Sequence, residues 1–410
     1  MRTQGIGRRS VLGAAGSLLA SPAVVRAQGQ AGVALVIGNS KYKWEASLPN
    51  VRRDGSDVAK RFEQLGLKTS FIQDVGLDAM KQAFDRFFDT ARSANLAALY
   101  FAGHGARWGS ENYIVPVDAD LSTPSVIESL VNVSFLSGGL KGARRSLLVF
   151  DSCRNNPADG WRQREAIQAA ANNRRVLSTL RPDLQILYST PPGRVALDGP
   201  AGQNSPFAAS FLRQLAGPSV DLQALPGKLR RDLLIATETR QVLWDLNTFQ
   251  GSFLLTGPES RAAADKSGWS GDPSRIMELP NAYAFAKEHD HFMPPGLIAL
   301  RPRQGASHSN KVGAFKFDNS NPQPAILVVM SVDEPQDVQL LFMNRGPDRY
   351  PFWRTTTGTL SGETLDFTSF DGGSRFTLTW KNANSGTATE QHVGQGPGQI
   401  RIKSMSRLDG

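Results

Sequence analysis

Cysteine is almost absent from this chain, since Cys153 is the single one among 410 residues. A lone thiol cannot form an internal disulfide, and it cannot build a zinc site from several cysteines. Long basic runs interleaved with aromatic residues are also missing, so nothing indicates nucleic-acid binding. A packed core must therefore hold the fold, and the thiol needs an explanation of its own.

The sequence also lacks a phosphate-cradling glycine loop, the Gly-x-Ser-x-Gly turn of serine hydrolases and any internal repeat of useful length. What it has is 40% hydrophobic and 20% charged residues, a composition that buries a core. Its length of 410 residues favours two or three domains.

Residues 1–27 have the features of an export signal. Arg8 and Arg9 precede a weakly apolar run that ends in the small-x-small site Val25-Arg26-Ala27. We predict a twin-arginine signal peptide, a periplasmic protein and no stable membrane insertion after cleavage. The alternative is a retained transmembrane anchor, but about 15 moderately apolar residues fall short of the ~20 that a bilayer span needs.

Residues 28–256 predict an α/β domain, because short apolar runs alternate with segments of helical periodicity. The predicted strands are Val33–Ile37, Leu67–Ile72, Leu96–Phe101, Ser146–Phe150, Leu184–Tyr188 and Ser252–Leu255. The predicted helices are Asp57–Leu65, Leu77–Ala91 and one that opens with Ser205-Pro206 and runs to Leu215. We expect a six-stranded, mostly parallel sheet flanked by helices.

The rest of the chain changes in character. Residues 257–301 begin with a stretch rich in Gly, Ser, Pro, Asp and Ala, which predicts a linker. Residues 302–410 predict a small β-rich domain, a sandwich or a barrel, to which no motif assigns a role. Its predicted strands are Ala325–Ser331, Val338–Met343, Arg375–Lys381 and Gln399–Lys403.

Two segments carry residues suited to chemistry. His104 stands between two glycines where one apolar strand ends, and Cys153 follows another in Asp151-Ser152-Cys153. Ligands of parallel α/β sheets gather outside the carboxyl ends of the strands. A thiol needs a base or a cationic neighbour to become reactive, and histidine is one at neutral pH. Taken singly, a lone cysteine is more often a small buried apolar residue, and a lone histidine is more often a hydrogen-bonded surface or core residue.

The spacing joins the two residues, because His104 precedes Cys153 by 49 residues and the caspase histidine lies about 50 residues before its cysteine. From about Gly32 to Leu255 the sequence resembles the caspase and metacaspase family, most closely bacterial caspase-like peptidases. The motifs that carry the resemblance are Ala34–Tyr42, Tyr100–Gly105, Asn112–Ala119, Asp151–Pro157, Tyr188–Thr190, Gly193–Ala196, Asn204–Phe207 and Gln241–Trp244.

The resemblance implies a caspase-like sheet and a cysteine-type endopeptidase that acts on a peptide or protein substrate. By this resemblance Cys153 is the nucleophile and His104 the general acid and base. The backbone N–H groups of Gly105 and Cys153 form the oxyanion hole. Family members can be cut in the loop after the cysteine, where this chain has Arg162, Arg164, Arg174, Arg175 and Arg181. The alternative for that segment is an exposed charged loop.

Charge predicts the specificity. Animal caspases have Gln two residues before the cysteine, whereas this chain has Asp151, which favours cleavage after Arg or Lys as in metacaspases. Asp54 matches an acidic family position and is a second candidate wall of the pocket; its alternative is a charge at a helix N-terminus. Ala102 and Arg154-Asn155 depart from the metacaspase pattern, so other pocket details do not transfer.

No resident cofactor or metal site is predicted. Metacaspases are often activated by calcium through an acidic cluster, but only Asp159 and Asp183 lie in that region. His289-Asp290-His291 has metal-like composition without a third partner. The sequence leaves the oligomeric state open. It also leaves two rival functions: a non-catalytic caspase-fold scaffold that acts through its C-terminal β domain, and a redox-sensing thiol.

Overall fold

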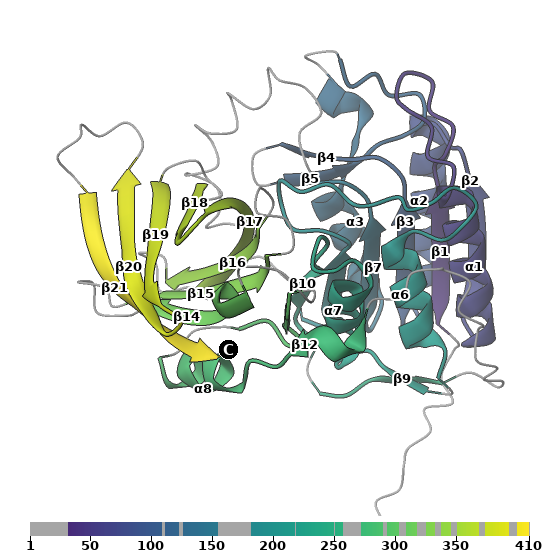
Figure 1. Ribbon diagram of the computed structural model, residues 1–410. Helices are drawn as coiled ribbons and strands as arrows, with labels where there is room; N and C mark the ends of the chain where they lie inside the picture. Colours follow the sequence, from purple (N-terminus) through teal and green to yellow (C-terminus); the bar gives the residue numbers. More distant parts are fainter. Residues whose placement is uncertain are drawn as a thin grey trace, which may run out of the picture.

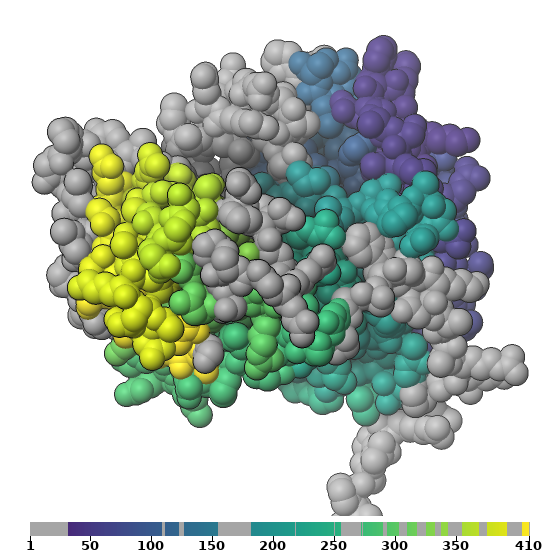
Figure 2. All heavy atoms as spheres, viewed as in Figure 1, coloured from purple at the N-terminus to yellow at the C-terminus, as the bar shows by residue number. Residues whose placement is uncertain are grey.

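The computed structural model describes residues 32–108, 111–122, 126–154, 182–217, 219–249, 251–256, 272–289, 293–302, 309–317, 325–332, 338–345, 351–368, 374–392 and 400–409. It consists of an α/β domain and a β-barrel that lie side by side (Figures 1 and 2). The predicted signal peptide and the arginine-rich loop lie outside the described residues. None of the helices in these ranges is long and apolar enough to cross a bilayer.

A six-stranded sheet forms the centre of the first domain, in the order β10-β8-β7-β3-β1-β2. Its strands are β1 (Val33–Gly38), β2 (Lys68–Gln73), β3 (Ala97–Ala102), β7 (Ser146–Asp151), β8 (Leu184–Tyr188) and β10 (Trp244–Asn247). All neighbours pair in parallel except β10, which is antiparallel to β8. The predicted mostly parallel sheet is confirmed.

The predicted strand Ser252–Leu255 overlaps an observed strand, but its expected place in the central sheet is wrong. Residues Leu254–Thr256 form β11, which pairs with β9 (Ser219–Asp221) in a separate two-stranded sheet. The sheet is completed instead by β10, whose Trp-Asp-Leu-Asn sequence alternates apolar and polar residues at an edge. An edge strand needs no continuous apolar run. Trp244 packs against Tyr188 of β8, with 5.6 Å between ring centroids.

Helices cover both faces of the sheet (Figure 1). One face packs against α1 (Val51–Gln64), α6 (Pro206–Leu215) and α7 (Leu225–Ala236), and the other against α2 (Leu77–Ala91) and α3 (Val133–Gly139). Side chains of a strand alternate between the two faces. In β3, Ala98 and Tyr100 accordingly join the first core and Leu99 and Phe101 the second.

The helix predictions are confirmed at α2 and α6, whose bounds agree with the sequence pattern. Ser205 caps α6, because its hydroxyl accepts a hydrogen bond from the Ala208 N–H at 2.9 Å. α1 begins earlier than predicted, at Val51, because its first turn carries polar residues that have no helical apolar spacing.

A small three-stranded sheet follows β3: β4 (Gly105–Trp108), β5 (Glu111–Ile114) and β6 (Val131–Asn132). The short helices η1 (Val126–Ser129) and η2 (Leu140–Gly142) flank β6 and α3. Since β4 starts directly beyond the carboxyl end of β3, this sheet borders the edge at which His104 and Cys153 lie.

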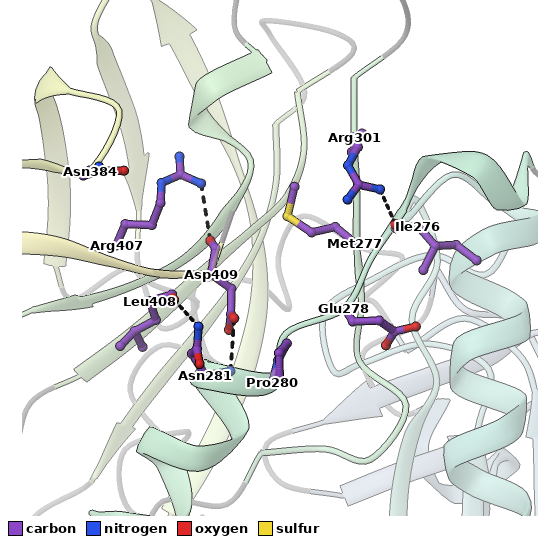
Figure 3. Close-up of a pocket in the computed structure, with 10 residues that line it drawn as sticks. All are labelled: Ile276, Met277, Glu278, Pro280, Asn281, Arg301, Asn384, Arg407, Leu408 and Asp409. Atoms are coloured by element: carbon purple, nitrogen blue, oxygen red, sulfur yellow. Dashed lines mark hydrogen bonds between the residues drawn. The ribbon is translucent and has the colours of Figure 1, made fainter.

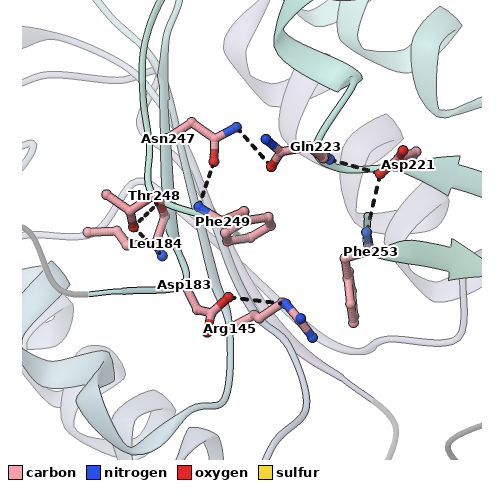
Figure 4. Close-up of polar contacts among 9 residues, drawn as sticks. All are labelled: Arg145, Asp183, Leu184, Asp221, Gln223, Asn247, Thr248, Phe249 and Phe253. Atoms are coloured by element: carbon pink, nitrogen blue, oxygen red, sulfur yellow. Dashed lines mark hydrogen bonds and ion pairs between the residues drawn. The ribbon is translucent and has the colours of Figure 1, made fainter. Parts of the chain in front are cut away.

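Polar contacts tie together the opposite edge, where β7 and β8 begin and β10 ends (Figure 4). Thr248 bonds to both backbone groups of Leu184 at 3.0 Å, and Arg145 lies 3.4 Å from the Asp183 carboxylate. The Asp221 side chain accepts N–H groups of Gln223 and Phe253. These contacts fix the loops around β9 and β10 far from the strand ends that carry the predicted site.

The predicted linker, residues 257–301, is wrong for its second half. Residues 257–271 lie outside the described ranges, but the chain then forms η3 (Pro273–Arg275), β12 (Ile276–Met277), α8 (Pro280–Glu288) and β13 (Ala299–Leu300). Leu279, Ala282 and Ile298 are fully buried there. The segment is a structured connection, because these apolar residues belong to the same buried cluster as the barrel residues.

The C-terminal domain is a closed eight-stranded barrel, so the predicted β-rich domain is a barrel and not a sandwich. After η4 (Ser309–Lys311), its strands are β14 (Gly313–Phe317), β15 (Ala325–Ser331), β16 (Val338–Arg345), β17 (Pro351–Ser361), β18 (Thr364–Thr368), β19 (Ser374–Asn382), β20 (Ser385–His392) and β21 (Ile400–Asp409). β14 pairs with β21 and closes the barrel, which leaves no open sheet edge. In β19 the predicted alternation holds, with Phe376, Leu378 and Trp380 buried.

The two domains share a core. Leu234 of α7 and Val242, which precedes β10, belong to the same buried cluster as the barrel residues. Thr239 and Ser331 of β15 are joined by a buried hydrogen bond of 2.7 Å between their hydroxyls. The barrel therefore packs on the β10 side of the sheet as part of one structure.

Candidate active site

His104 and Cys153 lie at the same edge of the sheet. β3 and β7 are neighbours in parallel register, with Ala102 opposite Asp151, and each candidate follows its strand by two residues. The Gly103 N–H donates to the Asp151 carbonyl at 3.2 Å, which joins the two segments beyond the sheet. A Cβ at Gly103 would lie 2.5 Å from the Tyr42 hydroxyl, so glycine is required there.

The His104 ring is held from two sides. It packs against the Tyr42 ring with 4.5 Å between centroids, and the His104 N–H donates to the Tyr42 hydroxyl at 2.7 Å. The ring Nε2 lies 2.8 Å from the Ala46 carbonyl. A carbonyl only accepts, so Nε2 carries the proton and the Nδ1 lone pair is left to act as a base. No sequence pattern indicates this carbonyl, because any residue type supplies one.

Cys153 is partly exposed, and its surroundings favour the neutral thiol. Burial raises the pKa of the thiol, and the nearby carboxylates of Asp151 and Asp198 raise it further. The Ala196 N–H, which donates to the sulfur, acts in the opposite direction. Any reaction of this sulfur as a nucleophile therefore requires a base that removes the thiol proton.

Gly105 lies against the backbone of the cysteine loop. A Cβ at this position would lie 2.5 Å from the Cys153 carbonyl oxygen and 2.7 Å from the Ser152 hydroxyl. Gly105 faces Ile114 across the β4–β5 pair, and the Val115 N–H donates to the His104 carbonyl at 3.1 Å. Gly105 and Ile114 therefore form a non-hydrogen-bonded antiparallel pair, in which the Gly105 N–H is not used for strand pairing. The two predicted oxyanion donors thus belong to adjoining backbone segments.

Asp54 and Asp151 come together behind the thiol. Ser205 joins them, because its N–H donates to Asp54 Oδ1 at 3.0 Å and its hydroxyl to Asp151 Oδ2 at 2.6 Å. Burial raises the pKa of Asp151 to about 6, and burial together with Asp151 raises that of Asp54 well above its ordinary value. Asp54 Oδ2 is buried without a hydrogen-bond partner among the described residues.

Asp54 also fits its alternative interpretation, since it lies in the first turn of α1. However, its carboxylate accepts hydrogen bonds from Ser205 and from Asn204 Nδ2, both at 3.0 Å and both far away in the sequence. The side chain is therefore held toward Asp151 as well as placed at a helix end.

Asp198 is a third carboxylate that the sequence analysis missed. Burial raises its pKa, and the His104 ring lowers it. Its charge in turn raises the pKa of Asp54, Asp151 and Cys153. None of the ion pairs formed within the described ranges involves these three carboxylates. Asp198 follows no strand and shows no periodicity, so only the folded loop reveals it.

Arg154 points away from the carboxylates. It is buried, and its guanidinium lies 3.9 Å from the Tyr188 ring centroid and 4.6 Å from that of Trp244. Its Nε donates to Asn112 Oδ1 at 3.0 Å, and burial lowers its pKa to about 9. Arg154 thus joins β5, β8 and β10 beside Cys153.

Within the described ranges, no three His, Cys, Asp or Glu residues are grouped as metal ligands. Asp183 pairs with Arg145 at the amino end of the strands, opposite the cysteine, so it is not part of this site. His289 Nδ1 bonds to the Phe285 carbonyl at 2.9 Å. Asp159, Asp290 and His291 lie outside the described residues.

The described residues also form an open pocket of about 690 Å³ at the foot of the barrel (Figure 3). Its ten lining residues come from β12, α8, β21 and neighbouring segments, and none belongs to the candidate site. The Asp409 carboxylate accepts the N–H groups of Asn281 and Ala282 there, which caps α8. These contacts indicate a structural joint between α8 and the last strand.

Comparison with known proteins shows the family of the chain. A family model described as the caspase domain matches residues 31–252, more than half of the chain, so the chain belongs to this family. Mucosa-associated lymphoid tissue lymphoma translocation protein 1 of Homo sapiens is 29% identical over 144 residues, which are 34% of this chain and 17% of that protein. The chain thus spans a small part of this relative.

Among solved structures, the crystal structure of caspase-1 from Spodoptera frugiperda aligns with a TM-score of 0.43 and 14% identity. The alignment covers 57% of this chain and 92% of that one.

Proposed function

We propose that the protein is a cysteine-type endopeptidase that uses Cys153 and His104 as a catalytic dyad and cleaves after Arg or Lys. The observation that carries the specificity is the cluster of Asp54, Asp151 and Asp198, which are drawn together beside the thiol with no cation paired to them among the described residues. Buried carboxylates are costly unless a positive group joins them. A basic substrate side chain is such a group.

The first step forms a bond between the Cys153 sulfur and the scissile carbonyl carbon while His104 Nδ1 takes the thiol proton. The carbonyl oxygen becomes negative and is stabilised by the N–H groups of Gly105 and Cys153. The C–N bond then breaks as His104 returns the proton to the leaving amine. Water, deprotonated by His104, hydrolyses the resulting thioester, which releases the acid product and restores the thiol.

Substrate binding assists this first step electrostatically. The same carboxylates that receive the basic side chain raise the pKa of the thiol in the free protein. A bound cation offsets their charge, so the pKa of Cys153 falls when a matching substrate is present. Binding and activation of the nucleophile are thereby coupled.

The decisive experiment compares fluorogenic peptides that end in Arg, Lys or Asp, with and without calcium, using the chain purified without residues 1–27. The proposal requires cleavage of the Arg and Lys peptides and no cleavage by Cys153→Ala. Activity that survives this substitution would remove Cys153 from the mechanism.

We also propose that residues 1–27 direct export to the periplasm. Cell fractionation tests this proposal, because replacing Arg8 and Arg9 by Lys should leave the protein in the cytoplasm.

The rival functions give other results. A scaffold with an inaccessible thiol is not labelled by an Arg-ending peptidyl chloromethyl ketone. A redox sensor forms sulfenic acid at Cys153 without hydrolysing any peptide. Labelling of Cys153 by the Arg reagent, blocked by free Arg peptide, would exclude the scaffold, and hydrolysis of Arg peptides would exclude a thiol that acts only as a redox sensor.

A further inference from the structure

The barrel contacts the loop of residues 193–198, which lies beside Cys153. Arg194 Nη2 donates to Gln339 Oε1 of β16 at 3.0 Å. Gln339 is buried, and its strand lies on the side of the barrel nearest the α/β domain (Figure 1). The contact links two residues that are 145 positions apart in the sequence.

Arg194 belongs to the segment that shapes the site. Its carbonyl accepts the Arg154 N–H at 3.0 Å, and the Gly193 N–H donates to the Arg154 carbonyl at 2.8 Å. Two residues later the Ala196 N–H donates to the Cys153 sulfur, and four residues later stands Asp198. A shift of Arg194 therefore moves two of the groups that set the charge environment of the thiol.

A second tie fixes the same segment. The Leu197 N–H donates to Gln241 Oε1 at 3.0 Å, and Gln241 Nε2 donates to the Ser189 carbonyl at 2.9 Å. Gln241 lies between Thr239, which bonds to Ser331 of the barrel, and Val242, which is part of the shared core. The loop is thus held by the barrel directly through Arg194 and indirectly through Gln241.

We propose that the barrel is a built-in support of the active-site loop, and that Arg194 and Gln339 are positioning residues for the reaction at Cys153. The proposal deepens the peptidase function and rests on it. It gives residues 302–410 a task in catalysis that requires no separate ligand. The two side chains act through the placement of Ala196 and Asp198.

A double-mutant cycle tests the proposal in the chain purified without residues 1–27. Gln339→Ala should lower kcat/KM for an Arg peptide by about tenfold, the effect of one lost hydrogen bond to a charged group. Arg194→Ala should cause a similar loss, and the double variant should lose no more than either single one. Gln339→Glu keeps an acceptor for Arg194 and should retain activity. Gln391→Ala, an exposed glutamine of β20, is the matched control.

A second readout does not depend on peptide cleavage. Iodoacetamide is small and uncharged, so its rate of reaction with Cys153 against pH reports the thiol environment without the basic pocket. Gln339→Ala should move the midpoint of this profile upward, because the Ala196 N–H no longer stabilises the thiolate. An unchanged profile and unchanged kcat/KM, or additive losses in the double variant, would overturn the positioning role.

The two readouts separate the proposals. If the parent chain cleaves no peptide but Gln339→Ala still shifts the alkylation profile, the peptidase function fails and the support of the loop stands. If the parent chain cleaves Arg peptides and neither readout responds to Gln339→Ala, the function stands and the support fails.

Discussion

Asp54 keeps one carboxylate oxygen buried without a partner among the described residues, next to Asp151. Asp54→Asn should therefore raise the melting temperature, because a neutral amide removes the cost of a buried charge. The same change should lower kcat/KM for Arg peptides by ~100-fold or more, the consequence of losing one partner of a buried ion pair. Thermal melts and peptide kinetics measure the two effects.

Asp78→Asn serves as the control for this change, because Asp78 also lies in the first turn of a helix, α2, but is exposed. The control variant should change neither the melting temperature nor kcat/KM greatly. A lower melting temperature with unchanged kinetics in Asp54→Asn would show that the carboxylate is structural.

The pKa of Asp151 gives a pH dependence with a definite sign. Its pKa is raised to about 6 by burial, so the carboxylate gains a proton and loses its charge as the pH falls through 6. Below pH 6 the KM for Arg peptides should therefore rise, whereas the KM for peptides with a neutral P1 residue should not. The free energy of unfolding changes in the opposite sense. Because the pKa of Asp151 is raised in the folded state, protonation at low pH stabilises the fold, and this stabilisation is lost as the pH rises through 6.

Asp151→Asn provides the comparison, because the variant should lose the rise in KM and the difference in melting temperature between pH 5 and 7 should shrink. Identical pH profiles for the two proteins would contradict the assignment of Asp151 to the pocket.

Some residues of the candidate site can be predicted from the sequence and others cannot. His104, Cys153 and Asp151 were found because they stand in motifs directly after apolar strands, where α/β folds place their ligands. Ala46 contributes a backbone carbonyl, which has no sequence signature. Asp198 stands in a loop whose path depends on contacts with Arg154 and the barrel. No local pattern predicts such a path.

The glycines of the β3–β4 turn act at the scale of the element. Gly105→Ala would bring a Cβ within 2.5 Å of the Cys153 carbonyl oxygen, so the turn or the cysteine loop must move. Activity should fall by ~100-fold or more, as when one oxyanion donor is lost. Gly138→Ala in α3 meets no atom within 4 Å and should instead stabilise the chain by roughly 0.5–1 kcal/mol. Equal activity in both variants would show that the turn tolerates the shift.

Elements with a strong internal period were predictable, and those defined by their neighbours were not. α2, α6 and β15 follow from apolar spacing and from capping residues. β10 has too few residues and too much polarity to be recognised alone, and its place depends on the exposed edge of β8. The second half of the predicted linker contains α8, which is capped by Asp409 of β21, the last strand of the barrel. Such a long-range cap has no local signal.

The shared core makes a prediction for the whole molecule. A chain that ends at residue 271 would expose Leu234 and Val242, which now pack among barrel residues. We expect a lower melting temperature and increased binding of a hydrophobic dye compared with the full chain, since newly exposed apolar area costs about 25 cal/mol per Å². Unchanged values for both would show that the α/β domain is independent of the barrel.

The hydrogen bond between Arg194 and Gln339 also has an evolutionary consequence. Two domains that met only through a flexible tether could diverge separately or be exchanged between proteins, but this contact makes substitutions on either side depend on the other. Related chains with both domains should therefore change positions 194 and 339 in concert, whereas relatives without the barrel should show no constraint at the arginine position.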